Sequence, residues 1–145
     1  MRYLFVLIII SSSIFAFGQK ERKYIRQGNS LYEQAIENSD STGVDSIGFA
    51  NAETQYRLAM EVRPDDYKAP FNIGAAQFKQ NQMEAAADQF ENVINTTDDK
   101  EVKAKAFFNK GNALLGQQKM DESIEAYKNA LRNNPKDVEA KYNLE

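Results

Sequence analysis

Residues 104–135 read AKAFFNKGNALLGQQKMDESIEAYKNALRNNP, and this stretch decides the fold of the chain. It holds two amphipathic helical patterns joined by a short polar turn at residues 116–121. Small residues fall where two packed helices would touch, and large residues fill the space between them. The small residues are Gly111, Ala113, Ser123 and Ala130, and the large ones are Phe107, Leu114, Ile124, Tyr127 and Leu131. Because Pro135 cannot continue a helix, the stretch predicts one complete helix–turn–helix unit.

Composition limits the possible functions. The chain has 145 residues, enough for one domain with its own core, and its 42% hydrophobic and 27% charged residues are typical of a globular protein. A formal net charge of -3 gives no overall positive field for nucleic acid. The absence of Cys and His from the sequence excludes thiol nucleophiles, disulfides, Cys/His zinc sites and imidazole catalysis. We therefore expect no cofactor and no metal ion.

Residues 1–18 differ from the rest of the chain. Arg2 is their only charged residue, residues 3–10 are apolar, and Ala16 and Gly18 place small residues at the −3 and −1 positions of a cleavage site. This pattern is typical of a secretory signal peptide. The alternative is an uncleaved N-terminal anchor, although about 15 apolar residues fall short of the ~20 that span a bilayer. In either case we expect an exported protein, in the periplasm or anchored to the inner membrane facing the periplasm.

Further helical patterns cover most of the remaining chain. Apolar residues recur at intervals of three and four over residues 20–37, 49–62, 67–80 and 83–94, and a short pattern begins again at residue 138. Pro64 is expected to stop the second of these helices, and Pro70 fits the first turn of the third.

The polar stretch at residues 38–48, NSDSTGVDSIG, predicts a loop. Two motifs in it, Asp40-Ser41-Thr42 and Asp45-Ser46-Ile47, resemble acceptor sites for O-glycans on exported bacterial proteins. Because such a motif is only three residues long, we favour the alternative that both are ordinary Asx-turns.

The helical patterns repeat when they are aligned on their glycines. Gly28, Gly74 and Gly111 each lie in the first helix of a pair, and an aromatic residue follows in the second helix, as Tyr56, Phe90 and Tyr127. The predicted domain, residues 19–145, then divides into unit one (21–66, with residues 38–48 inserted), unit two (67–103), unit three (104–137) and a partial unit four (138–145).

This pattern resembles the tetratricopeptide repeat, whose period is 34 residues. Units one and three match its small, aromatic and proline positions, whereas unit two departs from it at Pro70, Gln77 and Asp98. The resemblance implies an all-α fold, a right-handed superhelix of about 3 repeats plus the start of a fourth, and a non-enzymatic scaffold that binds other proteins. We expect the small residues to let the helices of a pair approach closely and the aromatic residues to lock neighbouring pairs.

A narrower resemblance rests on the ends of the mature chain. The predicted signal peptide, the segment KERKYIRQGN at residues 20–29, the insertion in unit one and the final AKYNLE are similar to BatC-type proteins of the Bacteroides aerotolerance operon. That resemblance implies partners among Bat-type membrane proteins with von Willebrand A-type domains. The Gln-rich tail common in that family is missing from this sequence.

In such a superhelix the first helix of each unit lines the concave face. The residues expected to bind a peptide or partner there are Arg22, Arg26, Asn29, Lys68, Phe71, Asn72, Phe78, Lys105, Phe108, Asn109, Asn112 and Tyr142. Amides can bond an extended backbone, aromatic rings can hold its side chains, and cations attract its acidic groups. The alternative is that Phe71 and Phe108 belong partly to the core between repeats and that Asn72 and Asn109 satisfy neighbouring backbone.

Some domains of this kind clamp a C-terminal carboxylate with two Lys, two Asn and an Arg. Asn29, Asn72 and Lys105 match that set, but Ile25 and Asn109 stand where two of its cations belong. The clamp is therefore incomplete.

Two other functions compete with the scaffold. An enzyme acting on cell-wall material, or an accessory to such a hydrolase, would need paired carboxylates; candidates by type are Glu84, Asp88, Glu91, Asp121, Glu122 and Glu125. A homo-oligomer would use the apolar residues Tyr142 and Leu144 of the partial unit, whose helix lacks its partner.

Overall fold

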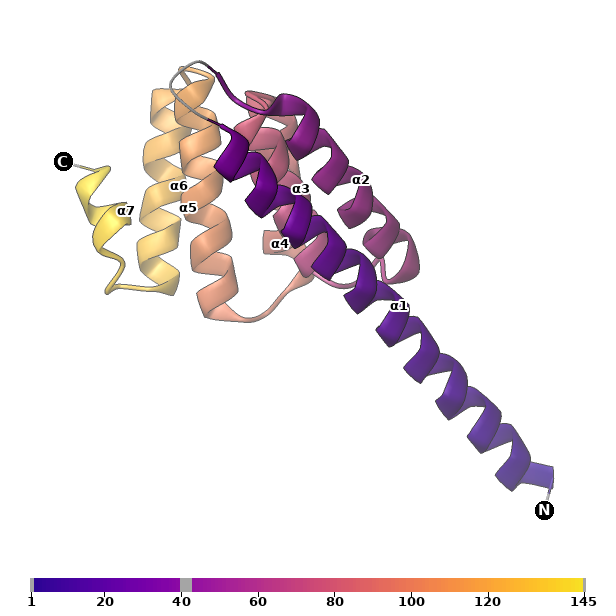
Figure 1. Ribbon diagram of the computed structural model, residues 1–145. Helices are drawn as coiled ribbons and strands as arrows, with labels where there is room; N and C mark the ends of the chain where they lie inside the picture. Colours follow the sequence, from indigo (N-terminus) through magenta and orange to yellow (C-terminus); the bar gives the residue numbers. More distant parts are fainter. Residues whose placement is uncertain (1, 40–42, 145) are drawn as a thin grey trace.

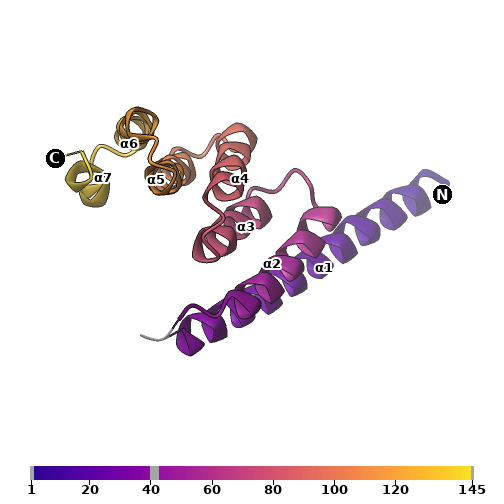
Figure 2. The same cartoon turned by 90° about the horizontal axis from the view of Figure 1, so that it is seen from above.

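The computed structural model describes residues 2–39 and 43–144, with side chains described from Gly18 onward. Its regular elements are α1 (Arg2–Asn38), α2 (Ser46–Val62), α3 (Lys68–Lys79), α4 (Met83–Thr96), α5 (Lys100–Gly116), α6 (Met120–Asn133) and α7 (Val138–Tyr142). Three helix pairs, α1 with α2, α3 with α4 and α5 with α6, stack one after another, and α7 packs on the last pair (Figures 1 and 2). The predicted all-α superhelix of about three repeats and the start of a fourth is confirmed.

Helix α1 is longer than the pattern predicted for residues 20–37, because it begins at Arg2. Within the described part of the chain, no helix combines the length and the apolar character needed to cross a membrane. The assignment of residues 1–18 as a signal peptide stays a prediction.

The loop between α1 and α2 is shorter than predicted, since α2 begins at Ser46 and not at residue 49. Asp45 explains the early start: its side chain accepts a hydrogen bond from the Gly48 N–H at 2.8 Å and caps the helix. Asn38 Nδ2 donates to the same carboxylate at 3.2 Å, and the two bonds lower the pKa of Asp45. The Asp45-Ser46-Ile47 motif is thus a helix cap, while Asp40-Ser41-Thr42 lies outside the described residues.

A second aspartate moves the start of the third pair in the same way. Helix α5 begins at Lys100, before the predicted start of unit three at residue 104. The Asp99 side chain accepts hydrogen bonds from the Glu101 and Val102 N–H groups at 2.8 and 3.2 Å. The polar stretch that precedes unit three therefore caps a helix that has already begun.

The three repeat glycines each face the aromatic ring of their own unit. Gly28 faces Tyr56, Gly74 faces Phe90, and Gly111 faces Tyr127. A Cβ atom on Gly111 would lie 2.6 Å from the Tyr127 ring, and one on Gly74 would lie 3.0 Å from the Phe90 ring. Tyr56 and Phe90 also pack on the next unit, against Ile73 and Ala113, so the prediction that the aromatics lock neighbouring pairs is confirmed for these two rings.

Polar side chains join unit one to unit two. The carboxylate of Glu53 on α2 accepts hydrogen bonds from Arg57 at 2.6 and 2.9 Å, from Gln77 at 3.1 Å and from Gln80 at 3.0 Å. Gln77 is only 4% exposed, so its amide needs such a partner. This network explains why an amide replaces the large apolar residue that the repeat pattern expects at Gln77.

Candidate binding groove

Asparagine amides and tyrosine hydroxyls are hydrogen-bonded in succession along the face that α1, α3 and α5 share. We call this series the ladder, and each asparagine–tyrosine pair within one unit is a rung. In unit one, Asn29 Oδ1 accepts a hydrogen bond from the Tyr56 hydroxyl at 3.0 Å and a longer one from Asn72 Nδ2 of the next unit at 3.5 Å. The Tyr56 ring is 2% exposed, and burial raises the pKa of its hydroxyl, with smaller contributions from Tyr32 and Glu33. The hydroxyl therefore stays a hydrogen-bond donor at physiological pH.

The same arrangement recurs in unit three. Asn112 Oδ1 accepts from the Tyr127 hydroxyl at 2.7 Å and from Asn143 Nδ2 of the partial fourth unit at 3.3 Å. Each rung thus joins the two helices of one unit and reaches the first helix of the next. This fixes the relative position of successive units on the inner face.

Unit two, all of which the structure describes, has no such rung. Ala75 occupies the position of Asn29 and Asn112, and Phe90 occupies the position of the two tyrosines. Asn109 of the next unit consequently has no amide oxygen to bond there, and its side chain makes no hydrogen bond to any residue that the structure describes.

Two adjoining hollows follow the ladder, and together we call them the inner groove. One has a volume of about 170 Å³ and is lined by Asn29, Tyr32, Glu33, Tyr56, Asn72 and Ala75. The other has a volume of about 200 Å³ and is lined by Tyr32, Ala75, Phe78, Lys79, Phe90, Asn109 and Asn112. Tyr32 and Ala75 line both hollows, so the two hollows adjoin and together extend over units one to three.

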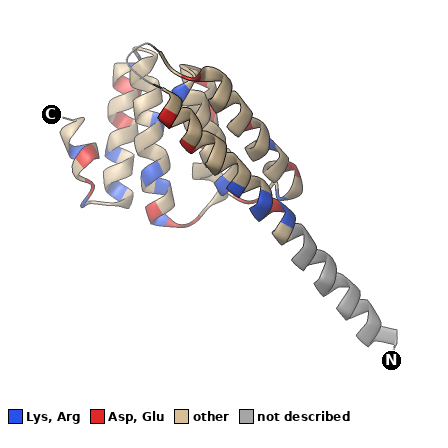
Figure 3. Cartoon of the chain, viewed as in Figure 1, with Lys and Arg blue, Asp and Glu red and all other residues tan. Residues whose placement is uncertain are grey.

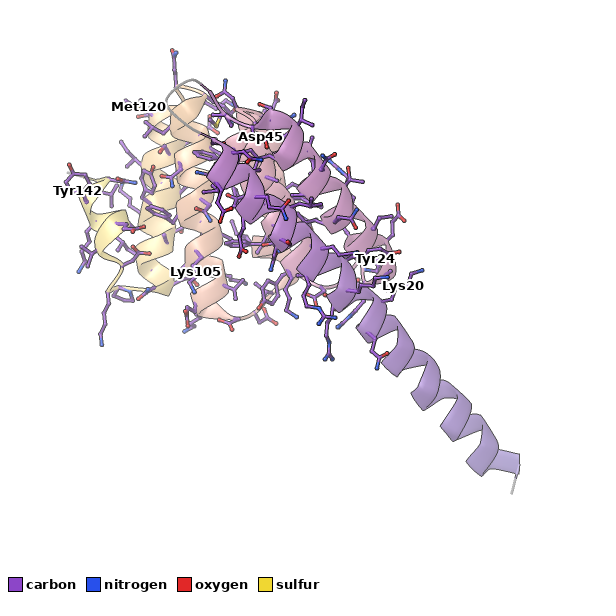
Figure 4. The ribbon with its side chains drawn as sticks, viewed as in Figure 1. Lys20, Tyr24, Asp45, Lys105, Met120 and Tyr142 are labelled. Carbon is purple, nitrogen blue, oxygen red and sulfur yellow. The ribbon has the colours of Figure 1, made fainter. Side chains whose placement is uncertain are left out.

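Cations gather beside the inner groove at the beginning of unit one. An open hollow of about 860 Å³ is lined by Gln19, Lys20, Glu21, Arg22, Lys23, Ile25, Arg26 and Lys68. We call it the basic notch; Figure 3 shows its blue bands along the described part of α1, and Figure 4 places Lys20 and Tyr24 at this end. Within the described chain, Lys68 is paired with Asp66 at 3.3 Å, whereas Arg22 and Arg26 have no ion-pair partner.

The structure brings most of the predicted binding residues together. Those that line the inner groove or the basic notch are Arg22, Arg26, Asn29, Lys68, Asn72, Phe78, Asn109 and Asn112. The remaining four, Phe71, Lys105, Phe108 and Tyr142, line neither. The role of all twelve in binding stays a prediction.

Two of those four pack between helices, and one of them, Phe71, reaches the core between repeats that the alternative interpretation expected. Phe71 packs edge-to-face on Phe90 with ring centroids 5.6 Å apart, and it also contacts the core formed by α4 and α5. Phe108 lies against Tyr127 with centroids 5.8 Å apart. The other half of that interpretation is wrong, since Asn72 bonds the Asn29 side chain rather than backbone.

The carboxylate clamp loses a further member in the structure. Lys105 donates a hydrogen bond to Glu101, one turn earlier on α5, at 2.8 Å, and this bond raises the pKa of Lys105. Asn29 already accepts two hydrogen bonds. Asn29 and Asn72 both line the inner groove, but the one matching cation, Lys105, does not, so the geometry does not favour a clamp.

Acidic candidates for catalysis lie elsewhere, in a hollow of about 210 Å³ between α4, α5 and α6. Four of the six acids line it, namely Glu84, Asp88, Glu91 and Glu122, together with Lys110 and Lys119. The Lys110 ammonium binds Glu91 at 2.6 Å. The acids are closer together than the sequence suggested, and one of them, Glu91, is neutralised by this ion pair.

Sequence reasoning missed the contribution of the second helices to the groove. Tyr56 and Phe90 come from α2 and α4, yet their rings reach the inner face past the repeat glycines. A signal was present in the sequence: a tyrosine accompanies asparagine in units one and three, and a phenylalanine accompanies alanine in unit two.

Comparisons with known proteins agree with this fold. Two family models described as tetratricopeptide repeat match residues 48–99 and 104–137, and together they cover more than half of the chain. No curated protein sequence matches the chain.

Several solved structures are similar. The first TPR domain of Spaghetti (RPAP3) bound to the HSP90 peptide SRMEEVD has a TM-score of 0.73 at 21% identity, over 87% of this chain and 88% of that one. The N-terminal domain of stress-induced protein-1 from C. elegans has a TM-score of 0.73 at 20% identity, over 89% and 94%. The second TPR domain of human RPAP3 in complex with the HSP70 peptide SGPTIEEVD has a TM-score of 0.70 at 18% identity, over 90% and 93%.

At these identities the likeness concerns the fold alone. The repeat glycines, the aromatic rings beside them and the two family matches agree on one assignment. This chain belongs to the tetratricopeptide repeat family.

Proposed function

We propose that the chain is a non-enzymatic scaffold whose inner groove binds an extended segment of a partner protein. The observation that carries this proposal is the pair of adjoining hollows along units one to three, lined by amides and aromatic rings. An extended segment leaves its backbone groups unpaired, and amide side chains such as Asn109 can bond them. The aromatic rings supply apolar contact area for its side chains.

The similar structures support a peptide as the bound element. Two of them hold a peptide, and both peptides are acidic near one end. In this chain the acidic part of a segment is expected to meet the basic notch rather than a carboxylate clamp, because Arg22 and Arg26 have no ion-pair partner in the described chain and Lys105 is already paired. Tetratricopeptide repeat proteins generally act in this way, as interaction modules without catalysis of their own.

The proposed setting is the bacterial envelope. The signal peptide at residues 1–18 and the BatC-like segments at residues 20–29 and 140–145 support an exported scaffold that assembles a complex with von Willebrand A-type membrane proteins, related to aerotolerance. N-terminal sequencing of the protein recovered from the envelope tests export with cleavage. A start at Gln19 is expected, and a start at Met1 contradicts cleavage.

A second candidate function is self-association through the last helix. Val138 and Tyr142 on α7 are 74% and 77% exposed, and α7 lies at the opposite end of the stack from Lys20 (Figure 4). Exposed apolar side chains of this size favour contact with another protein surface, here a second copy of the chain. Sedimentation velocity at several concentrations separates the two functions: a monomer at every concentration contradicts self-association.

The groove proposal is tested with a purified von Willebrand A-type domain from the same organism. The double variant Asn72→Ala/Asn109→Ala is expected to raise the Kd by tenfold or more, because both amides line the inner groove. The matched control Asn92→Ala/Asn95→Ala removes two exposed amides from α4 and is expected to leave the Kd unchanged. Equal affinities of the two double variants, at equal helicity by circular dichroism, would show that binding does not use the inner groove.

A further inference from the structure

Charge is distributed unevenly along the chain. Residues 1–32 hold five of the 18 cations and one of the 21 acids, which gives this segment a net charge of +4. Residues 33–145 hold the other 13 cations and 20 acids, a net charge of -7. Without residues 1–18, which contribute only Arg2, the first segment still carries +3. A charge asymmetry of this kind is typical of a protein with one end at an anionic surface.

The cations of the first segment surround the exposed side of α1. We call Lys20, Arg22, Lys23 and Arg26 the basic collar; all four are exposed, and none has an ion-pair partner in the described part of the chain. At 3.6 residues per turn they spread over about 160° of the helix circumference. The acid among them, Glu21, is 2% exposed and lies on the opposite side, 3.8 Å from Arg63. The exposed side of α1 is therefore purely positive at this end.

The basic collar lies where α1 leaves the stack of helices. Helix α1 begins at Arg2 and is continuous through the collar, which directly follows the largely apolar residues 3–17 of the sequence. Figure 1 shows this part of α1 projecting beyond the helix pairs, and Figure 4 places Lys20 at the same end. An apolar segment with adjoining cations provides two membrane-binding contributions, apolar insertion and attraction to anionic head groups. The collar supplies the second contribution with or without residues 1–18.

We propose that the basic collar binds the surface of an anionic phospholipid membrane and so orients the domain on it. The inference takes the envelope setting from the proposed function, but it does not involve the inner groove. The lipid phosphates attract the collar, and the same surface repels the net charge of -7 on residues 33–145. Attraction and repulsion both turn the beginning of α1 toward the membrane.

The arrangement of the collar favours a membrane over an acidic protein segment. Arg22 lies two turns before Asn29, so it lies on the side of α1 that lines the inner groove. Arg26 lies about 40° from Arg22 around the helix, whereas Lys20 and Lys23 lie about 100–160° from it. A segment in the inner groove accounts for the two arginines but not for the two lysines. An extended anionic surface at the end of α1 accounts for all four.

The size of the effect follows from the number of cations at the surface. Each Lys or Arg near an anionic membrane contributes about fivefold to binding, so Lys20 and Lys23 together account for about 10- to 30-fold. The attraction is electrostatic and is screened by salt. Raising the salt from about 0.1 M to 1 M shortens the Debye length from about 10 Å to 3 Å and is expected to abolish the contribution.

The test measures partition onto lipid vesicles by flotation, with the protein in the form recovered from the envelope. One set of vesicles contains phosphatidylglycerol and phosphatidylcholine, and the other contains phosphatidylcholine alone. Partition onto the anionic set is expected to be stronger by about tenfold or more. Lys20→Gln/Lys23→Gln is expected to remove most of this preference. The matched control Lys136→Gln/Lys141→Gln changes the net charge equally at two exposed positions of the other end and is expected to change partition less than threefold, which is about the effect of one distant charge.

Three results would overturn the membrane proposal. They are equal partition onto anionic and neutral vesicles, no partition onto either set, and equal losses in the two double variants at equal helicity by circular dichroism. A fourth is a collar variant that loses affinity for the von Willebrand A-type domain while its vesicle partition is unchanged, because the collar would then serve an acidic protein. The groove variant Asn72→Ala/Asn109→Ala is expected to keep its vesicle partition, so the groove proposal and the membrane proposal fail separately.

Discussion

Replacing Gly111 with alanine tests how closely the two helices of a unit approach each other. The added Cβ atom would lie 2.6, 2.8 and 3.1 Å from three ring atoms of Tyr127. The ring has little freedom to withdraw, because Tyr127 is 1% exposed, its hydroxyl is bonded to Asn112 at 2.7 Å, and Phe108 lies against it. The clash must therefore be relieved by separating α5 from α6.

The magnitude is set by two opposing effects. Overpacking of a closely packed core costs about 1–3 kcal/mol, whereas alanine gains about 1 kcal/mol over glycine in helix propensity. The expected net change for Gly111→Ala is a loss of about 1 kcal/mol, and at most about 2 kcal/mol, in the free energy of unfolding. The control Gly116→Ala lies in the same helix and meets only the flexible side chain of Met83, so its stability is expected to be unchanged or to rise by up to about 1 kcal/mol.

Urea unfolding followed by circular dichroism, with linear extrapolation to water, measures both variants. Adding Tyr127→Leu to Gly111→Ala removes the ring that the methyl group meets. The double-mutant cycle is then expected to show a coupling of about 1 kcal/mol or more. If Gly111→Ala proved as stable as Gly116→Ala, the close approach of Gly111 to Tyr127 would be refuted.

Three further predictions concern single positions. Gln118 lies at φ 62° in the turn between α5 and α6, so Gln118→Gly is expected to raise the free energy of unfolding by about 0.5–1 kcal/mol. The control Lys128→Gly, at an exposed position of α6, is expected to lower it by about 1 kcal/mol. A lower stability of Gln118→Gly would contradict the left-handed backbone at this position. Tyr127→Phe is expected to lower the free energy of unfolding in urea by about 1 kcal/mol, because it removes the 2.7 Å hydrogen bond to the Asn112 amide oxygen. The control Tyr142→Phe removes an exposed hydroxyl from α7 and is expected to leave the stability unchanged. Equal stabilities of the two variants would contradict a stabilising role for the ladder. Hydrogen bonds at the α2 cap hold the pKa of Asp45 below its ordinary 3.8, so its stabilising effect is complete above about pH 4 and is lost as pH falls through the folded-state pKa. The melting temperature of the wild type is expected to exceed that of Asp45→Ala above about pH 4, and the difference is expected to disappear in stronger acid. A difference that persists in stronger acid would contradict stabilisation by the ionised Asp45 cap.

The architecture could be predicted from the sequence because it depends on the regular spacing of apolar and small residues along the chain. Apolar residues at helical spacing, glycines at matching places and Pro135 after the third pair are together sufficient to define the repeat. Helix boundaries were harder to predict. Asp45 and Asp99 lie in polar stretches that predict loops, and only their bonds to backbone N–H groups reveal that helices begin there.

The groove could be predicted only in part. The first helices were expected to line it, and eight of the twelve predicted residues do line the inner groove or the basic notch. The ladder could not be foreseen from local pattern, since Asn29 bonds Tyr56 and Asn72, which are far from it in sequence. Phe71 could not be placed from the sequence because an aromatic residue on a helix face fits both a groove and a core; in the structure its ring packs on Phe90, and its role in binding stays a prediction.

The most direct test of the central claim, that a partner segment lies in the inner groove, is an NMR titration that follows the side-chain amides of the asparagines. A labelled sample of the whole chain is titrated with the purified von Willebrand A-type domain. The account predicts that the amide signals of Asn72 and Asn109 shift or broaden while that of Asn95 on the outside of α4 stays unchanged. Saturating shifts at Asn95, with Asn72 and Asn109 unaffected, would contradict it.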